Sequence, residues 1–138
     1  MKNQENAGDR SLAGKCLCGA VHYAVADEFV YAANCHCSNC RRTTGSAFKP
    51  FGGIERGKLE LTEGADMLLV YGEDDLHDAH CAECGSLLYS VVRAGEYVHV
   101  AYGSLVDPPS LAPTEHIFVG SKASWYEITD ELPQNQEY

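Results

Sequence analysis

The chain has 138 residues, enough for one domain with one core, and 45% of them are apolar, as in ordinary globular proteins. Twenty acidic and ten basic residues give a formal net charge of −10, which disfavours nucleic acid as a partner because readers of phosphate backbones carry a basic face. The sequence has no long apolar run and no basic leader, so we expect neither a membrane span nor a secretory signal.

The predicted elements are short strands separated by glycine, proline and polar residues. They fall at 19–26, 46–51, 58–63, 86–93 and 97–102, and a fully apolar run at 67–71 has the pattern of a buried strand. Ala94-Gly95-Glu96 suits a hairpin loop between the last two strands, and 38–43 allows one helical turn. We therefore expect a single, mainly β domain over 14–132, with loose tails at 1–13 and 133–138.

Three cysteines, Cys35, Cys37 and Cys40, lie within six residues. Thiolates are soft ligands that hold zinc in a tetrahedral shell, so this loop predicts a zinc site. Three ligands leave the fourth position open, as in catalytic zinc sites, unless a ligand from elsewhere closes it, as in structural ones. The spacing of the loop alone favours neither reading.

The other four cysteines form two clips, Cys16-Leu17-Cys18 and Cys81-Ala82-Glu83-Cys84. Structural zinc sites are commonly built from two such clips, so a division into four ligands and three ligands uses all seven cysteines. A different division, with Cys35, Cys37, Cys81 and Cys84 on one metal, is equally compatible with the spacing. Metal ligation requires reduced thiols, and we therefore expect a cytoplasmic location.

The three clips and their neighbours resemble the glutathione-dependent formaldehyde-activating (Gfa) family, which also includes the domain of centromere protein V. The resemblance runs from about Gly14 to Trp125 and rests on four stretches in the family's order: GKCLCGAV from Gly14, CHCSNCRRTTGSAF from Cys35, CAECGS from Cys81 and IFVGSKASW from Ile117. One departure is His80, where the family usually has an aromatic residue.

The resemblance implies a single-domain, zinc-bound β-tent (Mss-like) fold with two zinc ions. It implies a structural zinc on Cys16, Cys18, Cys81 and Cys84 and a catalytic zinc on Cys35, Cys37 and Cys40. The implied activity is that of a carbon–sulfur lyase or synthase acting on a thiol adduct, with glutathione and formaldehyde as the family's case.

Several residues outside the cysteines are candidates for the site. Arg41 could clamp a carboxylate of a peptide-like thiol or pair with an acid of the chain, and Lys122 is a weaker candidate of the same kind. His36 is interpreted as a group supporting the cysteine loop or facing solvent, rather than a ligand. Trp125 is expected in the core, because tryptophan buries a large area.

Two functions compete on this sequence. The first is an enzyme in which a substrate thiol enters the open zinc position, loses its proton and becomes a nucleophile. The second is a non-catalytic zinc module that binds a protein or a small thiol through the same fold. An exchangeable fourth ligand beside a cleft favours the enzyme, and a closed, buried zinc favours the binding module. The oligomeric state is not encoded in any pattern that we recognise.

Overall fold

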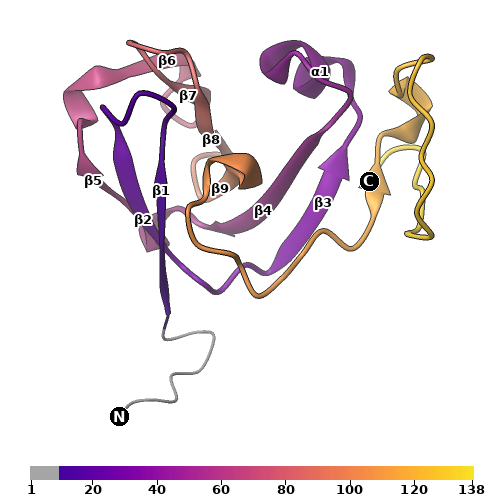
Figure 1. Ribbon diagram of the computed structural model, residues 1–138, viewed down its shortest axis with the longest axis horizontal. Helices are drawn as coiled ribbons and strands as arrows, with labels where there is room; N and C mark the ends of the chain where they lie inside the picture. The colour runs from indigo at the N-terminus through magenta and orange to yellow at the C-terminus, as the bar shows by residue number, and fades with distance from the viewer. Residues whose placement is uncertain (1–9) are drawn as a thin grey trace.

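The computed structural model describes residues 10–138 and has ten strands in two sheets, with one short α-helix. The prediction of a mainly β protein is confirmed (Figure 1). The first nine residues of the predicted N-terminal tail lie outside the described residues. Single-turn 3-10 helices connect the elements at Arg56–Lys58, Ala65–Met67, Tyr102–Ser104 and Val119–Ser121. No helix of the described part of the chain is both long and apolar enough to cross a membrane.

The smaller sheet has the order β1-β2-β5, with β1 at Ser11–Lys15, β2 at His22–Ala26 and β5 at Leu59–Glu63. Both pairings are antiparallel. Buried and exposed residues alternate along β1, as expected for a sheet with one face on a core. Residues 11–13 belong to this strand, so the sequence-based boundary of the N-terminal tail was wrong by three residues. The segment was assigned to the tail because the residues around it are polar. Its pairing with β2 is a contact between distant residues, which the local sequence does not indicate.

The larger sheet has the order β10-β3-β4-β9-β8-β7-β6 and curls along its length (Figure 1). Its strands are β3 (Tyr31–Cys35), β4 (Lys49–Glu55), β6 (Leu68–Glu73), β7 (Leu76–Cys81), β8 (Leu87–Val92), β9 (Tyr97–Ala101) and β10 (His116–Ile117). All neighbours are antiparallel except β10 and β3. The predicted hairpin between β8 and β9 is present, and its turn has positive φ at Arg93, Ala94 and Gly95.

The main core lies between the two sheets. Leu12 and Tyr23 of the smaller sheet belong to the same buried cluster as Ile54, Leu88 and Val100 of the larger one. Burial of such side chains is worth about 1.5–3 kcal/mol each relative to exposure. One close approach within this core requires glycine, because a Cβ at Gly14 would lie 2.0 Å from the Tyr23 ring.

Two expectations about burial were wrong. The apolar run at 67–71 falls mostly in β6, which is the edge strand of the larger sheet, and Leu69 and Tyr71 are 57% and 80% exposed. Trp125, expected in the core, is 72% exposed. An apolar run predicts a strand but not its position in the sheet, and position decides which faces are covered.

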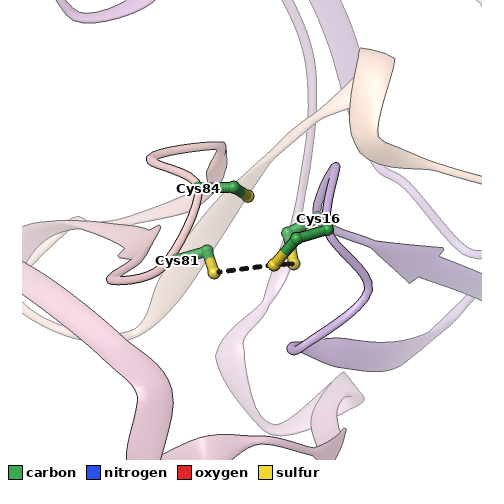
Figure 2. Close-up of side chains that lie close together, drawn as sticks. Cys16, Cys81 and Cys84 are labelled. Carbon is green, nitrogen blue, oxygen red and sulfur yellow. Dashed lines mark hydrogen bonds between the residues drawn. The ribbon is translucent and has the colours of Figure 1, made fainter.

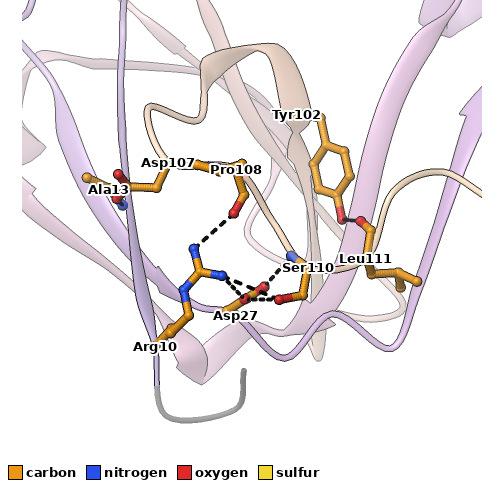
Figure 3. A network of polar contacts seen from close by, with 8 residues as sticks. All are labelled: Arg10, Ala13, Asp27, Tyr102, Asp107, Pro108, Ser110 and Leu111. Atoms are coloured by element: carbon orange, nitrogen blue, oxygen red, sulfur yellow. Dashed lines mark hydrogen bonds and ion pairs between the residues drawn. The ribbon is translucent and has the colours of Figure 1, made fainter. Parts of the chain in front are cut away.

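A polar network fastens the segment 102–111 to β1 and to the end of β2 (Figure 3). The buried carboxylate of Asp27 pairs with Arg10 at 3.1 Å and accepts hydrogen bonds from the Ser110 hydroxyl at 2.6 Å and the Ser110 N–H at 3.0 Å. Asp107 accepts from the Ala13 N–H at 2.8 Å. Part of this segment lines a cavity of about 700 Å³, and the network therefore helps to shape that cavity.

The C-terminal residues 133–138, expected as a tail, hydrogen-bond to the segment around β10. The His116 N–H donates to the Pro133 carbonyl at 2.8 Å, and the Asn135 N–H donates to the His116 carbonyl at 2.9 Å. In Figure 1 this segment runs beside β10, on the outer side of β3.

Candidate metal centres

Cys16, Cys18, Cys81 and Cys84 converge from two turns far apart in the sequence. Their sulfurs all lie within 4.8 Å of one another, and Figure 2 shows Cys81 and Cys84 directed from one turn toward Cys16 on the other. The Cys16–Cys18 and Cys18–Cys81 sulfur separations are 3.7 Å and 3.8 Å. A zinc ion with bonds of about 2.3 Å to a regular tetrahedron of sulfurs holds those sulfurs about 3.8 Å apart. The four sulfurs therefore lie close to the arrangement that a zinc ion requires.

The surroundings of Cys84 favour a thiolate. The Leu17 N–H donates to the Ser86 hydroxyl oxygen at 3.0 Å, which leaves the Ser86 hydroxyl proton free to donate to the Cys84 sulfur at 3.2 Å. The hydrogen bonds that Cys84 accepts from the hydroxyl and the backbone N–H of Ser86 lower the pKa of Cys84 to about 5. Because a metal binds the deprotonated thiol, this hydrogen bonding prepares one ligand before the metal arrives.

Cys35, Cys37 and Cys40 form a second cluster at the end of β3 and the start of helix α1 (Ser38–Thr44). Cys37 is the N-cap of that helix, and its sulfur accepts a hydrogen bond from the Cys40 N–H at 3.2 Å. The helix ends at Gly45, whose φ of 66° is left-handed. One short helical turn thus brings three sulfurs within 4.8 Å of one another.

The thiols of this second cluster are coupled. A hydrogen bond between Cys35 and Cys40 lowers the pKa of Cys35 and, with burial, raises the pKa of Cys40. Within residues 10–138 no fourth cysteine, histidine or carboxylate ligand atom joins the cluster. Three clustered sulfurs could hold a metal ion and leave one position for another ligand.

The structure groups the seven cysteines as four and three. The alternative set of Cys35, Cys37, Cys81 and Cys84 is not brought together, because Cys81 and Cys84 gather with Cys16 and Cys18 instead. The sequence spacing of the cysteines could not decide between these two ligand sets, because the distance between the clips in space depends on the order of the strands in the sheets.

His36, between two cysteines of the second cluster, is fully buried and is not one of the grouped ligands. Its Nε2 lies 2.8 Å from Nδ1 of His116, whose Nε2 lies 3.0 Å from the Asp130 carboxylate. Burial, followed by the nearby His116 and Lys122, lowers the pKa of His36 to about 4. The sequence-based interpretation of His36 as a supporting group agrees with this placement, but sequence gave no partner for it.

Arg41 and Lys122 bond to main-chain carbonyls. The Arg41 Nε donates to the Ser121 carbonyl at 3.2 Å, and the Lys122 Nζ donates to the carbonyls of Ala123 and Tyr126. Within residues 10–138 neither side chain forms an ion pair with an acid. Arg41 therefore joins helix α1 to the segment after β10, and its Nη atoms have no hydrogen-bond partner within residues 10–138.

Sequence reasoning missed Lys49, the first residue of β4. Its side chain is buried, with 6% of the residue exposed, and its Nζ donates to the Ser90 hydroxyl at 3.3 Å. Ser90 in turn donates to Asp78 at 2.6 Å. The only sequence signal was a lysine inside a predicted strand, which is usually a solvent-facing residue.

The cavity of about 700 Å³ lies beside the four-cysteine cluster and the end of helix α1. Its lining includes Cys16 and Cys84 of that cluster, Thr44 at the end of the helix, and Phe48 and Lys49 after it. None of the three cysteines of the second cluster lines it, but Thr44 adjoins them through a 2.7 Å bond from its hydroxyl to the Cys40 carbonyl. The volume suits a small molecule of peptide size.

Together, the two sheets and the two cysteine clusters define a small β protein with two clusters that could each hold a metal ion. The profile of the family described as "Glutathione-dependent formaldehyde-activating enzyme" matches residues 11–121, and the chain belongs to this family. The resemblance stated from the sequence is confirmed.

Individual relatives agree with that assignment. The chain is 32% identical over 135 residues to a Halomonas elongata protein provisionally named for the same activity, covering 85% of this chain and 80% of the relative. A Fusarium vanettenii protein with the same provisional name is 29% identical over 93 residues, 67% of this chain and 50% of its own length. A crystal structure of a Rhodobacter sphaeroides protein matches 73% of this chain and 97% of its own, with 28% identity and a TM-score of 0.58.

Proposed function

We propose that the protein is a zinc-dependent carbon–sulfur lyase or synthase acting on a thiol adduct, and that glutathione with formaldehyde is its substrate pair. Membership of the family supports the chemistry of thiol and aldehyde. The single observation that carries the proposal is the cluster of Cys35, Cys37 and Cys40, which no fourth ligand from residues 10–138 completes.

In this proposal the cysteine clusters have different roles. Cys16, Cys18, Cys81 and Cys84 hold a structural zinc ion that joins the β1–β2 turn to the end of β7, and the two sheets form a β-tent of the Mss-like kind. The spacing of their sulfurs, close to that of a tetrahedral zinc site, supports this role. Cys35, Cys37 and Cys40 would hold the second zinc ion, which would supply Lewis acidity to a substrate thiol beside them.

The reaction is an addition that needs little from the protein beyond orientation. The substrate sulfur loses its proton and attacks the aldehyde carbon, and the carbonyl oxygen takes up a proton, so that glutathione and formaldehyde give S-(hydroxymethyl)glutathione. A bound zinc ion would supply the Lewis acidity that keeps the substrate thiol deprotonated near neutral pH. The reverse direction breaks the same bond with the same groups.

The chain's own residues supply binding and support. The cavity beside helix α1 offers space for the peptide part of the thiol, and Arg41, which follows Cys40 in helix α1, is the proposed partner for a carboxylate. His36 and His116 hold the cysteine loop to the C-terminal segment. The functional unit is the predicted domain 14–132, extended at its start by the first residues of β1.

The test combines zinc content with turnover. Wild-type protein should contain two zinc ions per chain and should accelerate the formation of S-(hydroxymethyl)glutathione. The rate of formation is measured by nuclear magnetic resonance exchange spectroscopy. Cys37→Ser should contain one zinc ion, keep its β circular dichroism spectrum and lose the acceleration. A wild-type protein that binds two zinc ions but accelerates no thiol adduct beyond the rate of Cys37→Ser would instead be a zinc-binding module.

A further inference from the structure

A buried lysine faces the three-cysteine cluster. Lys49 of β4 is the register partner of Cys35 in β3, and these two strands run side by side below helix α1 (Figure 1). Directly opposite residues of an antiparallel pair project from the same face of the sheet. The lysine and the cysteine therefore share one face, with the hydroxyl of Ser90 within hydrogen-bond reach of the lysine Nζ.

The charge on Lys49 has no direct carboxylate partner within residues 10–138. Asp78 is reached only through Ser90, and of the three ammonium protons one has an acceptor in the described chain. The ring of Phe51, whose centroid is 5.8 Å from the Nζ, carries no net charge. A buried charge without an opposite charge beside it is costly, and lysine is almost never fully buried unless paired. The burial of Lys49 therefore points to another source of negative charge close to it.

The three-cysteine cluster is that source. Lys49 lies directly opposite Cys35 in the β3–β4 pair, and the sulfurs of Cys35, Cys37 and Cys40 lie within 4.8 Å of one another. Lys49 is thus close enough to favour negative charge on the cluster. A divalent ion with three thiolates carries a net charge of −1, and a fourth thiolate from a substrate makes it −2.

We propose that Lys49 compensates the second negative charge, and so sets how tightly the three-cysteine centre binds a substrate as a thiolate. This inference rests on the proposed function, because it concerns the ligand that enters the open position. Lys49 acts through the charge of the centre and not by bonding to the reacting carbon. A neutral ligand in the same position adds no charge and should be insensitive to the lysine.

A second role for Lys49 has to be distinguished from this one. Lys49 also lines the cavity, where it could bind a carboxylate of the substrate. Lys15 lines the same cavity but is solvent-exposed, so it is a matched control for a positive charge that is not buried at the cluster.

The experiment uses the full chain substituted with cobalt(II), whose visible spectrum reports each new ligand. Three ligands are titrated: 2-mercaptoethanol, a thiol without a carboxylate; glutathione; and imidazole, a neutral ligand. The variants are Lys49→Met, Lys49→Gln (which keeps a donor for Ser90), Lys49→Arg and Lys15→Met. Circular dichroism and cobalt content identify any variant that fails to fold.

We expect the two uncharged variants at position 49 to bind 2-mercaptoethanol and glutathione about tenfold or more weakly, since one unit charge at short range in a medium of low effective dielectric is worth at least that factor. Lys49→Arg should recover most of the affinity and Lys15→Met should match wild type. Imidazole should bind all five proteins alike.

Three results would overturn the inference. If the uncharged variants bind 2-mercaptoethanol as tightly as wild type, the charge of Lys49 does not affect thiolate binding. Weaker binding of glutathione alone makes Lys49 a carboxylate anchor, and equally weaker binding of imidazole makes its role structural. The inference and the proposed function can fail separately. If the wild-type protein forms no thiol adduct, the proposed activity is wrong. If Lys49→Met still binds thiolates more weakly than that wild type does, the inference about Lys49 holds.

Discussion

Nε2 of His36 lies 2.8 Å from Nδ1 of His116 in the protein interior, and this contact ties the three-cysteine loop to the C-terminal segment. The Asp130 carboxylate, 3.0 Å from Nε2 of His116, fixes a proton there. One of the two ring nitrogens in the His36–His116 contact donates and the other accepts. Nδ1 of His36 is buried and has no hydrogen-bond partner in the described chain.

The substitution His116→Leu should loosen the three-cysteine loop selectively. It removes the hydrogen-bond partner of His36 Nε2 and leaves a second buried polar atom of that ring unpaired, which costs about 1–3 kcal/mol. We expect faster release of one zinc ion to a chromophoric chelator and an unchanged rate for the other. His22→Leu, at a half-exposed site on β2, is the control. Release of both ions at wild-type rates would show that the histidine contact does not support the loop.

The two cysteine clusters should differ in their effect on folding. Cys84→Ser removes a ligand that joins two distant turns, and because binding energy at such a site is folding energy, we expect poor soluble yield and a melting temperature lower by about 10 °C or more. Cys37→Ser removes a ligand within one loop and should lower it far less. Differential scanning calorimetry of both variants, with metal analysis, makes the comparison. Equal destabilisation would mean that the clusters have the same role.

The buried carboxylate of Asp27 should contribute to stability through its bonds to Arg10 and Ser110. Asp27→Ala leaves the Ser110 N–H and the guanidinium without their shared acceptor, and we expect a loss of about 1–3 kcal/mol in urea unfolding. Glu28→Ala, next in the chain, breaks an ion pair with Lys58 at the surface and should leave the unfolding midpoint almost unchanged. A larger effect of Glu28→Ala than of Asp27→Ala would contradict the assignment.

The stability of the protein should fall in acid partly because of His99. Burial, together with the charges of Lys49 and Arg93, lowers the pKa of His99 to about 3, whereas an unfolded histidine titrates near 6.5. Between these values the unfolded chain binds one proton more, so the free energy of unfolding decreases as pH falls from about 6.5 toward 3.

Urea unfolding at several pH values between 7 and 4 tests this dependence. His99→Gln should show a shallower loss of stability over that interval, although it begins lower at pH 7 because the 2.8 Å contact with the Tyr31 hydroxyl is altered. The half-exposed His22 offers a control in His22→Gln, which should retain the wild-type slope. If the free energy of unfolding of His99→Gln falls with pH as steeply as that of wild type, His99 does not cause the acid sensitivity.

Local patterns in the sequence determined the β character, most strand positions and the three cysteine clips. Alternation, turn residues and clip spacing act over a few residues, so they can be read without the fold. The same patterns placed the β8–β9 hairpin and the short turn of helix α1 correctly. They also identified the family, because the clips occur in its order.

The tertiary structure decided everything that depends on contacts between distant segments. It made β6 an edge strand with Leu69 exposed, although its apolar run has the pattern of a buried one. It also gathered Cys81 and Cys84 with Cys16 and Cys18, and it brought His36 to a partner 80 residues away. Lys49 became a buried cation because β3 and β4 pair in a register that sets it opposite Cys35. Strand order and register arise from the packing of the whole chain, and no local pattern contains them.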